Sequence, residues 1–227
     1  MTLIPAISFF NPTLKENKQM VEGAATGITD FGLSQVFIMK KNQIQAGATV
    51  SKKGERKFIA GFFVSTVFGQ LLTNYNSATA TTSATVLSIG IETGLRPFLT
   101  KSKPTLCLLG LISAREALYW GGLKLTNELT KTKESNGYES FASQLIFSGI
   151  LANIFDTFAG QCSRHEFSTR EFLTDVIKKP SYYAMTYLKS LPSRITGCVL
   201  TPWLATQLIC NEKSQFQILI NQLCTKK

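Results

Sequence analysis

Residues 58–91, FIAGFFVSTVFGQLLTNYNSATATTSATVLSIGI, contain no charged residue over 34 positions. Asn74-Tyr75-Asn76-Ser77, in the middle of this stretch, is typical of a turn. The segments on either side are close to the roughly 17–25 residues that a helix needs to cross a bilayer. The stretch therefore predicts two membrane-spanning helices joined by a short turn.

Similar charge-poor stretches recur along the chain. They are residues 20–39, 58–73, 84–100, 105–125, 141–162 and 191–210. Ionisable residues lie inside several of them, namely Glu22, Asp30, Glu92, Arg96, Arg115, Glu116 and Asp156. A charge at the bilayer centre costs about 2.5–3.5 kcal/mol unless it faces water or a partner. We therefore expect an all-α bundle of six transmembrane helices with a polar interior. A soluble protein of amphipathic helices is the alternative.

The charges of the chain are segregated. Its 24 Lys and Arg residues against 14 Asp and Glu residues give a formal net charge of +10. Basic residues gather in the first, third and fifth connections between the stretches, and the second connection, residues 74–83, has no charge. This alternation is the asymmetry expected of a membrane topology, with the odd connections on one side. The basic connections predict contact with anionic lipid such as cardiolipin. No aromatic residues interleave with them, so we expect no nucleic-acid partner.

The sequence contains few groups that could do enzymatic chemistry. His165 is the single histidine, and the five cysteines form no CxxC pair. Phosphate-loop, dinucleotide-binding and nucleophile-elbow motifs are absent from the sequence. We therefore expect no enzyme, no metal and no cofactor.

Pairing the six stretches gives an internal threefold repeat after an N-terminal segment of residues 1–17. The repeats are residues 18–79, 80–135 and 136–227. The first helix of each repeat begins with two small or short residues four apart, which favours close helix packing in lipid. These pairs are Gly23 and Gly27, Gly90 and Gly94, and Gly149 and Asn153.

At this point the residues resemble the mitochondrial carrier family. Its odd helices begin with a GxxxG-like step and continue to Px[DE]xx[KR], often with a glutamine four residues beyond the basic position. In the first repeat Lys41 and Gln45 match the basic residue and the glutamine, and in the second Pro97 matches the proline. Arg115-Glu-Ala-Leu-Tyr119-Trp120-Gly121 looks like an even helix of the family. The chain is shorter than three family repeats. Such a shortened, degenerate carrier fits an effector that an intracellular bacterium delivers to host mitochondria, a protist version or a viral version.

The resemblance implies a multi-pass protein of the mitochondrial inner membrane, with the basic connections in the matrix. In the family, acid–base pairs close the matrix side. Here Ile38, Leu99 and Arg164 stand at the three acidic positions. We therefore expect that ring to be missing, and Arg164 to repel Lys41.

The expected function is transport of an anionic, phosphate-bearing metabolite, most plausibly a nucleotide such as ATP or ADP. The predicted substrate-binding residues are Arg115, Arg194 and Lys41, because buried basic groups pair with phosphates. Each of these three residues also has an alternative interpretation. Arg115 could instead form an ion pair with Glu116, Glu92 or Asp156 that only fixes packing. Arg194 could reach the membrane interface, and Lys41 could belong to the basic connection. The competing function is a carrier-derived subunit of a membrane complex that does not transport, with the chain either a monomer or part of that complex.

Overall fold

The computed structural model describes residues 14–46, 52–74, 78–100, 103–131 and 137–210, together with 215–216 and 218–219. These residues are helical almost throughout, and no strand occurs among them, so the all-α prediction is confirmed. The elements are α2 (Leu14–Ala46), α3 (Lys52–Asn74), α4 (Ala78–Thr100), α5 (Leu106–Lys131), α6 (Gly137–Gln144), the π-helical segment η1 (Leu145–Leu151), α7 (Ala152–His165), α8 (Thr169–Lys178), α9 (Pro180–Ile195), the π-helical segment η2 (Thr196–Leu200) and α10 (Thr201–Cys210).

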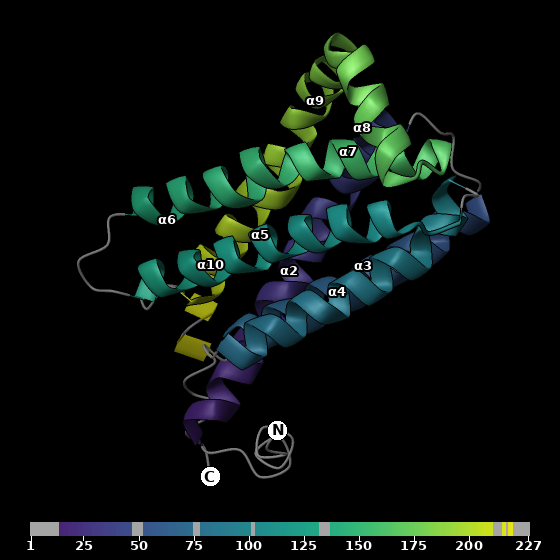
Figure 1. Cartoon of the computed structure of the whole chain (residues 1–227). Coiled ribbons are helices and arrows are strands. Elements are labelled where there is room, and N and C mark those ends of the chain that lie inside the picture. The colour runs from purple at the N-terminus through teal and green to yellow at the C-terminus, as the bar shows by residue number, and fades with distance from the viewer. Residues whose placement is uncertain are drawn as a thin grey trace.

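The long helices form rods that alternate in direction (Figure 1). The segments α6, η1 and α7 make one continuous rod, and α9, η2 and α10 make another. Each of the six charge-poor stretches falls on a different rod. The first, third and fifth rods end at one end of the bundle, which we call the odd end and which also carries α8. The start of α2 and the end of α10 lie at the opposite, even end (Figure 1).

The rods also bear on the predicted repeats. Each predicted repeat contains two rods. The first rod begins at Leu14, inside the predicted N-terminal segment, and α4 begins at Ala78, two residues before the predicted start of the second repeat. In the third repeat the short helix α8 separates the two rods. The bounds of the rods thus differ from the predicted bounds of the repeats by a few residues, and the threefold repeat remains a prediction.

Hydropathy alone gives weak support for a membrane. Among the described residues, one helix, Tyr138–His165, is long and apolar enough to cross a bilayer by length and composition. A buried helix of a soluble protein meets the same test, and 56% of this one's apolar window is buried. The other rods that the structure describes do not meet this test. Six membrane spans therefore remain a prediction.

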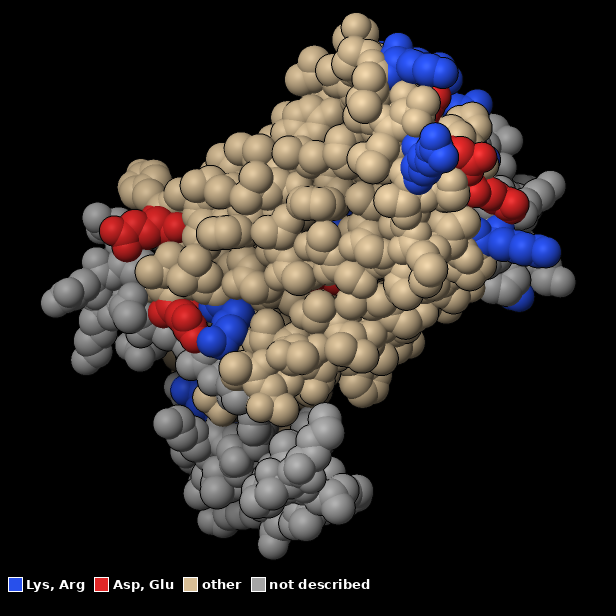
Figure 2. Space-filling model, in the orientation of Figure 1, with Lys and Arg blue, Asp and Glu red and all other residues tan. Residues whose placement is uncertain are grey.

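The interior of the bundle is unusually polar. Polar and charged residues outnumber hydrophobic ones among the buried residues that the structure describes. Large hydrophobic side chains are instead exposed on every rod, for example Val36, Phe68, Val86, Ile146 and Leu208. In the face shown in Figure 2, charged residues gather toward the two ends of the bundle, and the band between them is almost free of charge. This distribution is the reverse of that in a typical water-soluble protein.

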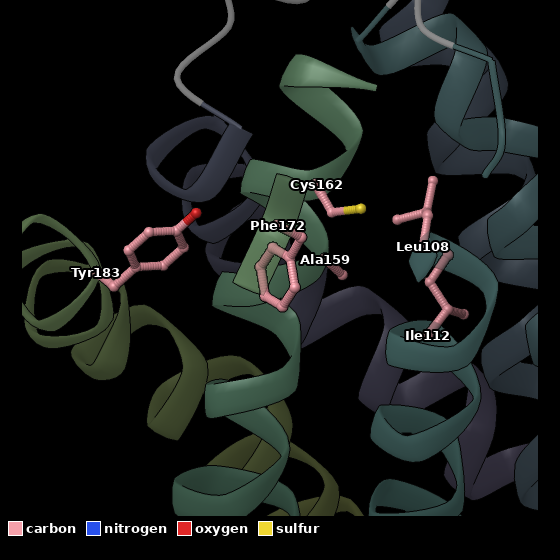
Figure 3. Packing of buried hydrophobic residues seen from close by; sticks show 6 residues of the cluster. All are labelled: Leu108, Ile112, Ala159, Cys162, Phe172 and Tyr183. Atoms are coloured by element: carbon pink, nitrogen blue, oxygen red, sulfur yellow. The ribbon is translucent and has the colours of Figure 1, made fainter. Parts of the chain in front are cut away.

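The main apolar cluster lies at the odd end. Leu108 and Ile112 of α5 pack toward Ala159 and Cys162 of α7, and Phe172 of α8 joins them. In Figure 3 the side chains of α7 and α8 lie between those of α5 and Tyr183 of α9. Phe172 and Tyr183 also make edge-to-face contacts with Phe158. This cluster fixes α8 across the ends of three rods.

The small residues in the first helix of each repeat differ in their packing. A Cβ on Gly27 would lie 2.7 Å from the Cα of Val67 in α3, and one on Gly149 would lie 2.9 Å from Val199 in η2. Both glycines therefore allow the close helix contacts that were expected. Gly90 and Gly94 have nothing within 4 Å of such a Cβ. The prediction of close packing at those two positions is wrong, because that face of α4 is open.

Candidate functional site

The three predicted binding residues meet at one carboxylate. Lys41 of α2, Arg115 of α5 and Arg194 of α9 are each at most 4% exposed. Asp156 of α7 is fully buried between them. Its Oδ1 accepts a hydrogen bond from Arg115 Nη1 at 2.8 Å, and its Oδ2 accepts one from Arg194 Nη1 at 2.8 Å. Lys41 Nζ also pairs with Oδ2. We call these four residues the Asp156 cluster.

Arg115 extends this cluster to two further acids. Its Nη1 lies 3.4 Å from Glu92 Oε1 of α4, and its Nη2 pairs with the neighbouring Glu116. Arg115 therefore pairs with all three acids that were considered from the sequence, namely Glu116, Glu92 and Asp156. Three basic groups face three carboxylates, so the formal charge of the network sums to zero. Buried charges need such compensation, because an uncompensated one is strongly destabilising.

Two π-helical segments position Arg194. A π-turn widens the helix and often occurs at functional sites. η1 carries Ser148, whose carbonyl oxygen accepts a hydrogen bond from Arg194 Nε at 2.7 Å. η2 begins two residues after Arg194. The guanidinium group also lies 6.0 Å from the centre of the Tyr119 ring. Arg194 thus points into the bundle and not to its surface.

A cavity adjoins the basic groups on the side of α3 and α4. Its volume is about 60 Å³, and it is partly open to solvent. Lys41, Arg115 and Arg194 line it together with Glu92 and Glu116. Its wall also contains aromatic rings, a thiol and hydroxyl groups, from Phe58, Phe62, Tyr119, Trp120, Cys198, Ser65, Thr66 and Ser88. Charged and stacking groups therefore face the same space.

Trp120 closes part of this cavity. It is 1% exposed, and its Nε1 donates hydrogen bonds to Ser88 Oγ at 2.8 Å and to Glu116 Oε2 at 3.0 Å. A Cβ on Gly69 of α3 would lie only 2.0 Å from the Trp120 ring. The indole ring therefore occupies space that is open only because residue 69 is a glycine.

A layer of polar contacts joins α2, α7 and α9 beside the Asp156 cluster. Gln45 Nε2 donates hydrogen bonds to Asn153 Oδ1 at 2.9 Å and to Ser190 Oγ at 3.3 Å. Gln161 Nε2 donates one to the carbonyl oxygen of Gln45 at 2.6 Å. A Cβ on Gly160 would lie 2.9 Å from the Gln45 backbone. These contacts hold the three rods together near the odd end.

The structure corrects the expected gate. Lys41 has an acidic partner on α7, but it is Asp156 and not a residue at the predicted position. Arg164, which stands at that position, is exposed and lies 3.4 Å from the hydroxyl group of Tyr182. The charged groups that act on Lys41 are Asp156, Arg194 and Arg115. The expected repulsion from Arg164 is therefore wrong. The side chain of Leu99 lies outside the described residues.

One signal in the sequence could have identified Asp156 as part of the site. Asp30 lies three residues after Gly27, and Asp156 lies three residues after Asn153. The two acids thus hold equivalent positions in the first and third predicted repeats. Nothing comparable singled out Cys198, whose place in the cavity wall depends on how η2 packs.

The helix α8 is the described element that best fits contact with anionic lipid. Ser168 caps it, and hydrogen bonds from Ser168 lower the pKa of Glu171. Hydrogen bonding by Lys179 lowers the pKa of Asp175. Exposed basic and apolar residues share the helix and its C-cap, namely Arg170, Leu173, Ile177, Lys178 and Lys179. The lipid contact itself remains a prediction.

Metal-ligating side chains do not gather in the described residues. No group of three His, Cys, Asp or Glu residues among them could hold a metal ion. His165 is exposed and stacks on Phe167, with 5.0 Å between ring centres.

No family model, curated protein or solved structure matches this chain. The carrier resemblance therefore rests on the residues themselves.

Proposed function

We propose that this chain is a carrier-type transporter that moves an anionic, phosphate-bearing metabolite, most plausibly a nucleotide such as ATP or ADP, across the mitochondrial inner membrane. One observation carries the proposal. Three basic side chains from three different rods are buried at one point and line the same cavity. A buried basic group inside a membrane bundle is costly and is retained where a ligand or partner needs it.

The distribution of polar residues supports the membrane assignment. Lipid favours apolar surfaces on every rod and tolerates charges only where they face a partner or a cavity. The exposed hydrophobic side chains and the neutral ion network meet both conditions. A soluble protein of this size seldom leaves so many large apolar side chains exposed, because they promote aggregation. Membrane spans that surround a polar cavity account for both features together.

The lining of the cavity supports a nucleotide over inorganic phosphate. Guanidinium groups hold phosphate oxygens by charge-assisted, bidentate hydrogen bonds. Aromatic rings at Tyr119 and Phe62 lie in the same wall and offer a stacking surface for a base. The lining thus offers basic groups for a phosphate and aromatic rings for a base.

Asp156 gives the transport cycle a physical basis. In the described state its carboxylate neutralises the basic groups and joins α7 to α2, α5 and α9. A ligand phosphate that enters the cavity competes with Asp156 for the same donors. Its binding therefore weakens the ties to α7, and the rods are freer to separate toward the odd end. A ligand shifts such an equilibrium only by its differential affinity for the two states.

The second candidate is the non-transporting subunit of a membrane complex. The complete pairing of all three basic groups favours it, because each one already has a carboxylate partner. In that case the network only fixes the packing of the rods.

Uptake into liposomes separates the two functions. The purified chain is reconstituted and supplied with labelled ATP, ADP, AMP and phosphate. We expect saturable nucleotide uptake, reduced at least about tenfold by Arg115→Ala, because a charge-assisted hydrogen bond contributes about 1.5–3 kcal/mol. Arg115→Lys should retain part of the uptake, since a point charge still attracts phosphate.

Lys124→Ala is the matched control, because Lys124 is a basic residue of the same helix that pairs with Glu128 outside the network. Its uptake should equal that of the unmodified chain. Absence of uptake for every compound in the panel contradicts transport. Equal uptake by Arg115→Ala and the unmodified chain contradicts the assignment of the site.

A further inference from the structure

A second buried acid lies outside the ion network. Asp30 of α2 is 1% exposed. Its Oδ1 lies 3.0 Å from Thr201 Oγ1 of α10. The amide of Gln70 in α3 lies beside the carboxyl group as a weak donor that favours the carboxylate, but its buried Nε2 makes no hydrogen bond of normal geometry. No Lys or Arg among the described residues forms an ion pair with Asp30, in contrast to Asp156.

The hydroxyl group of Thr201 has a single proton for two neighbouring oxygen atoms. It lies 3.0 Å from Asp30 Oδ1 and 3.1 Å from the carbonyl oxygen of Gly197. A hydroxyl group has one proton and two acceptor lone pairs. If Asp30 is a carboxylate, one of these contacts joins two acceptors with no proton between them. If Asp30 is protonated, it donates to Thr201, and Thr201 donates to Gly197. The protonated acid gives each of these two contacts a proton of its own.

The groups around Asp30 offer no positive charge to offset a carboxylate. α3 presents the neutral amide of Gln70, and α10 presents Thr201. The nearest titratable groups on other elements are Tyr119 of α5 and Cys198 of η2, both neutral in their ordinary state. Along α2 itself, Glu22 and Lys41 are eight and eleven residues away. A buried carboxylate without a partner is costly.

We propose that Asp30 carries a proton in the described state and exchanges it with the compartment to which the cavity opens, so that one proton moves with the anion. The inference rests on the proposed transport function. Tyr119 and Cys198 line the cavity and also interact electrostatically with Asp30, so we place the path for the proton through the layer of side chains that they form. When water enters that layer, the O–H bond of Asp30 breaks, the proton passes to water and Asp30 becomes a carboxylate. Reprotonation from the opposite compartment completes the step without any other reactant.

The placement of the two acids gives them separate roles. Asp156 and Asp30 hold equivalent positions in the third and first repeats, but three basic groups surround only Asp156. Asp156 neutralises the anion site in the absence of ligand. Asp30 carries the proton that crosses with the ligand, and this proton reduces the net charge that is moved.

The first experiment measures protonation without transport. Infrared spectra of the purified chain, taken across a pH titration, should contain a carboxylic-acid C=O band that Asp30→Asn removes and Asp175→Asn leaves in place. Thr201→Val should shift this band, because the acid loses its acceptor, and this variant keeps the test valid if Asp30→Asn fails to fold. If both Asp30→Asn and Thr201→Val leave the acid bands unchanged, Asp30 is not protonated and the proposal is overturned.

The second experiment measures coupling in liposomes that contain a pH-sensitive dye. Nucleotide uptake by the unmodified chain should acidify the interior, and an inside-alkaline gradient of one pH unit should raise accumulation by up to about tenfold for one proton per anion. Asp30→Asn should lose the response to the gradient, whereas Asp175→Asn should keep it. Uptake that ignores the gradient, or that needs sodium instead, overturns proton coupling and leaves the transport function standing. If no compound is taken up, the transport function fails with its coupling, and the infrared band still decides whether Asp30 is protonated.

Discussion

Asp156→Asn is the substitution that most sharply perturbs the site. The amide keeps the shape of the side chain but removes its charge, so three basic groups then face two acids and the network changes from neutral to a net charge of +1. One of the two positions that now accept from Arg115, Arg194 or Lys41 becomes an NH₂ donor. All four side chains are buried, so solvent screens the resulting repulsion very little.

Removal of one partner from a buried ion network costs about 3–5 kcal/mol. For a chain of this size that corresponds to a fall of roughly 6–20 °C in Tm. The assay is thermal unfolding in detergent, followed by a thiol-reactive dye that reaches the fully buried Cys162 only on unfolding. Asp175→Asn is the control, because its ion pair with the exposed Lys179 contributes at most about 1 kcal/mol.

Added nucleotide then separates the two functional candidates. If ligand phosphate takes the place of the Asp156 carboxylate, nucleotide should raise the Tm of Asp156→Asn by more than that of the unmodified chain. Equal shifts in both proteins would contradict competition at the site. A Tm that is unchanged by the substitution would contradict the buried network itself.

Three further predictions follow from other parts of the molecule. Protease treatment of mitoplasts should remove a tag at the N-terminus and spare one in residues 46–57, and the reverse pattern would contradict the orientation. Gly69→Ala should destabilise the chain by about 1–3 kcal/mol because its Cβ meets the Trp120 ring, whereas Gly90→Ala, in open space, should not, as thermal unfolding will show. The lowered pKa of Asp175 means that its stabilising contribution is complete above its unfolded pKa of about 3.9 and is lost as the pH falls through the lower folded value. The stability difference caused by Asp175→Asn should therefore shrink in acid, and a constant difference would refute this pairing.

The positions of the rods could be predicted from the sequence because charges interrupt the apolar stretches at their ends. The exact bounds of the rods could not be predicted. For example, α2 begins at Leu14, well before the charge-poor stretch that starts at residue 20. Charged residues at helix ends are compatible with continued helix when water solvates them. Mean hydropathy is also a limited guide to these rods. One described rod passes a hydropathy test, and polar residues that face the interior lower the mean hydropathy of the other described rods.

The site was predictable in its members and not in its geometry. Arg115, Arg194 and Lys41 stood out as basic groups in or beside apolar stretches, and the partners of Arg115 were among those considered. Their convergence on Asp156 depends on the register of α7 against three other rods. The π-helical segments η1 and η2 contribute to that register, and no motif in the sequence marks them. The carrier pattern pointed to Arg164, two turns beyond Asp156, and therefore did not reveal the acid that pairs with Lys41.

Labelling of Cys198 tests the central claim most directly, because this thiol lines the cavity beside the basic groups. A variant that keeps Cys198 and has serine at the other four cysteines is placed in vesicles and treated with an anionic, membrane-impermeant thiol reagent from either side. We predict that the reagent modifies Cys198 from both sides and that ATP or ADP slows the reaction, because the cavity opens alternately and holds the nucleotide. Labelling from one side only, at a rate that nucleotide does not change, would contradict a transport pathway through this cavity.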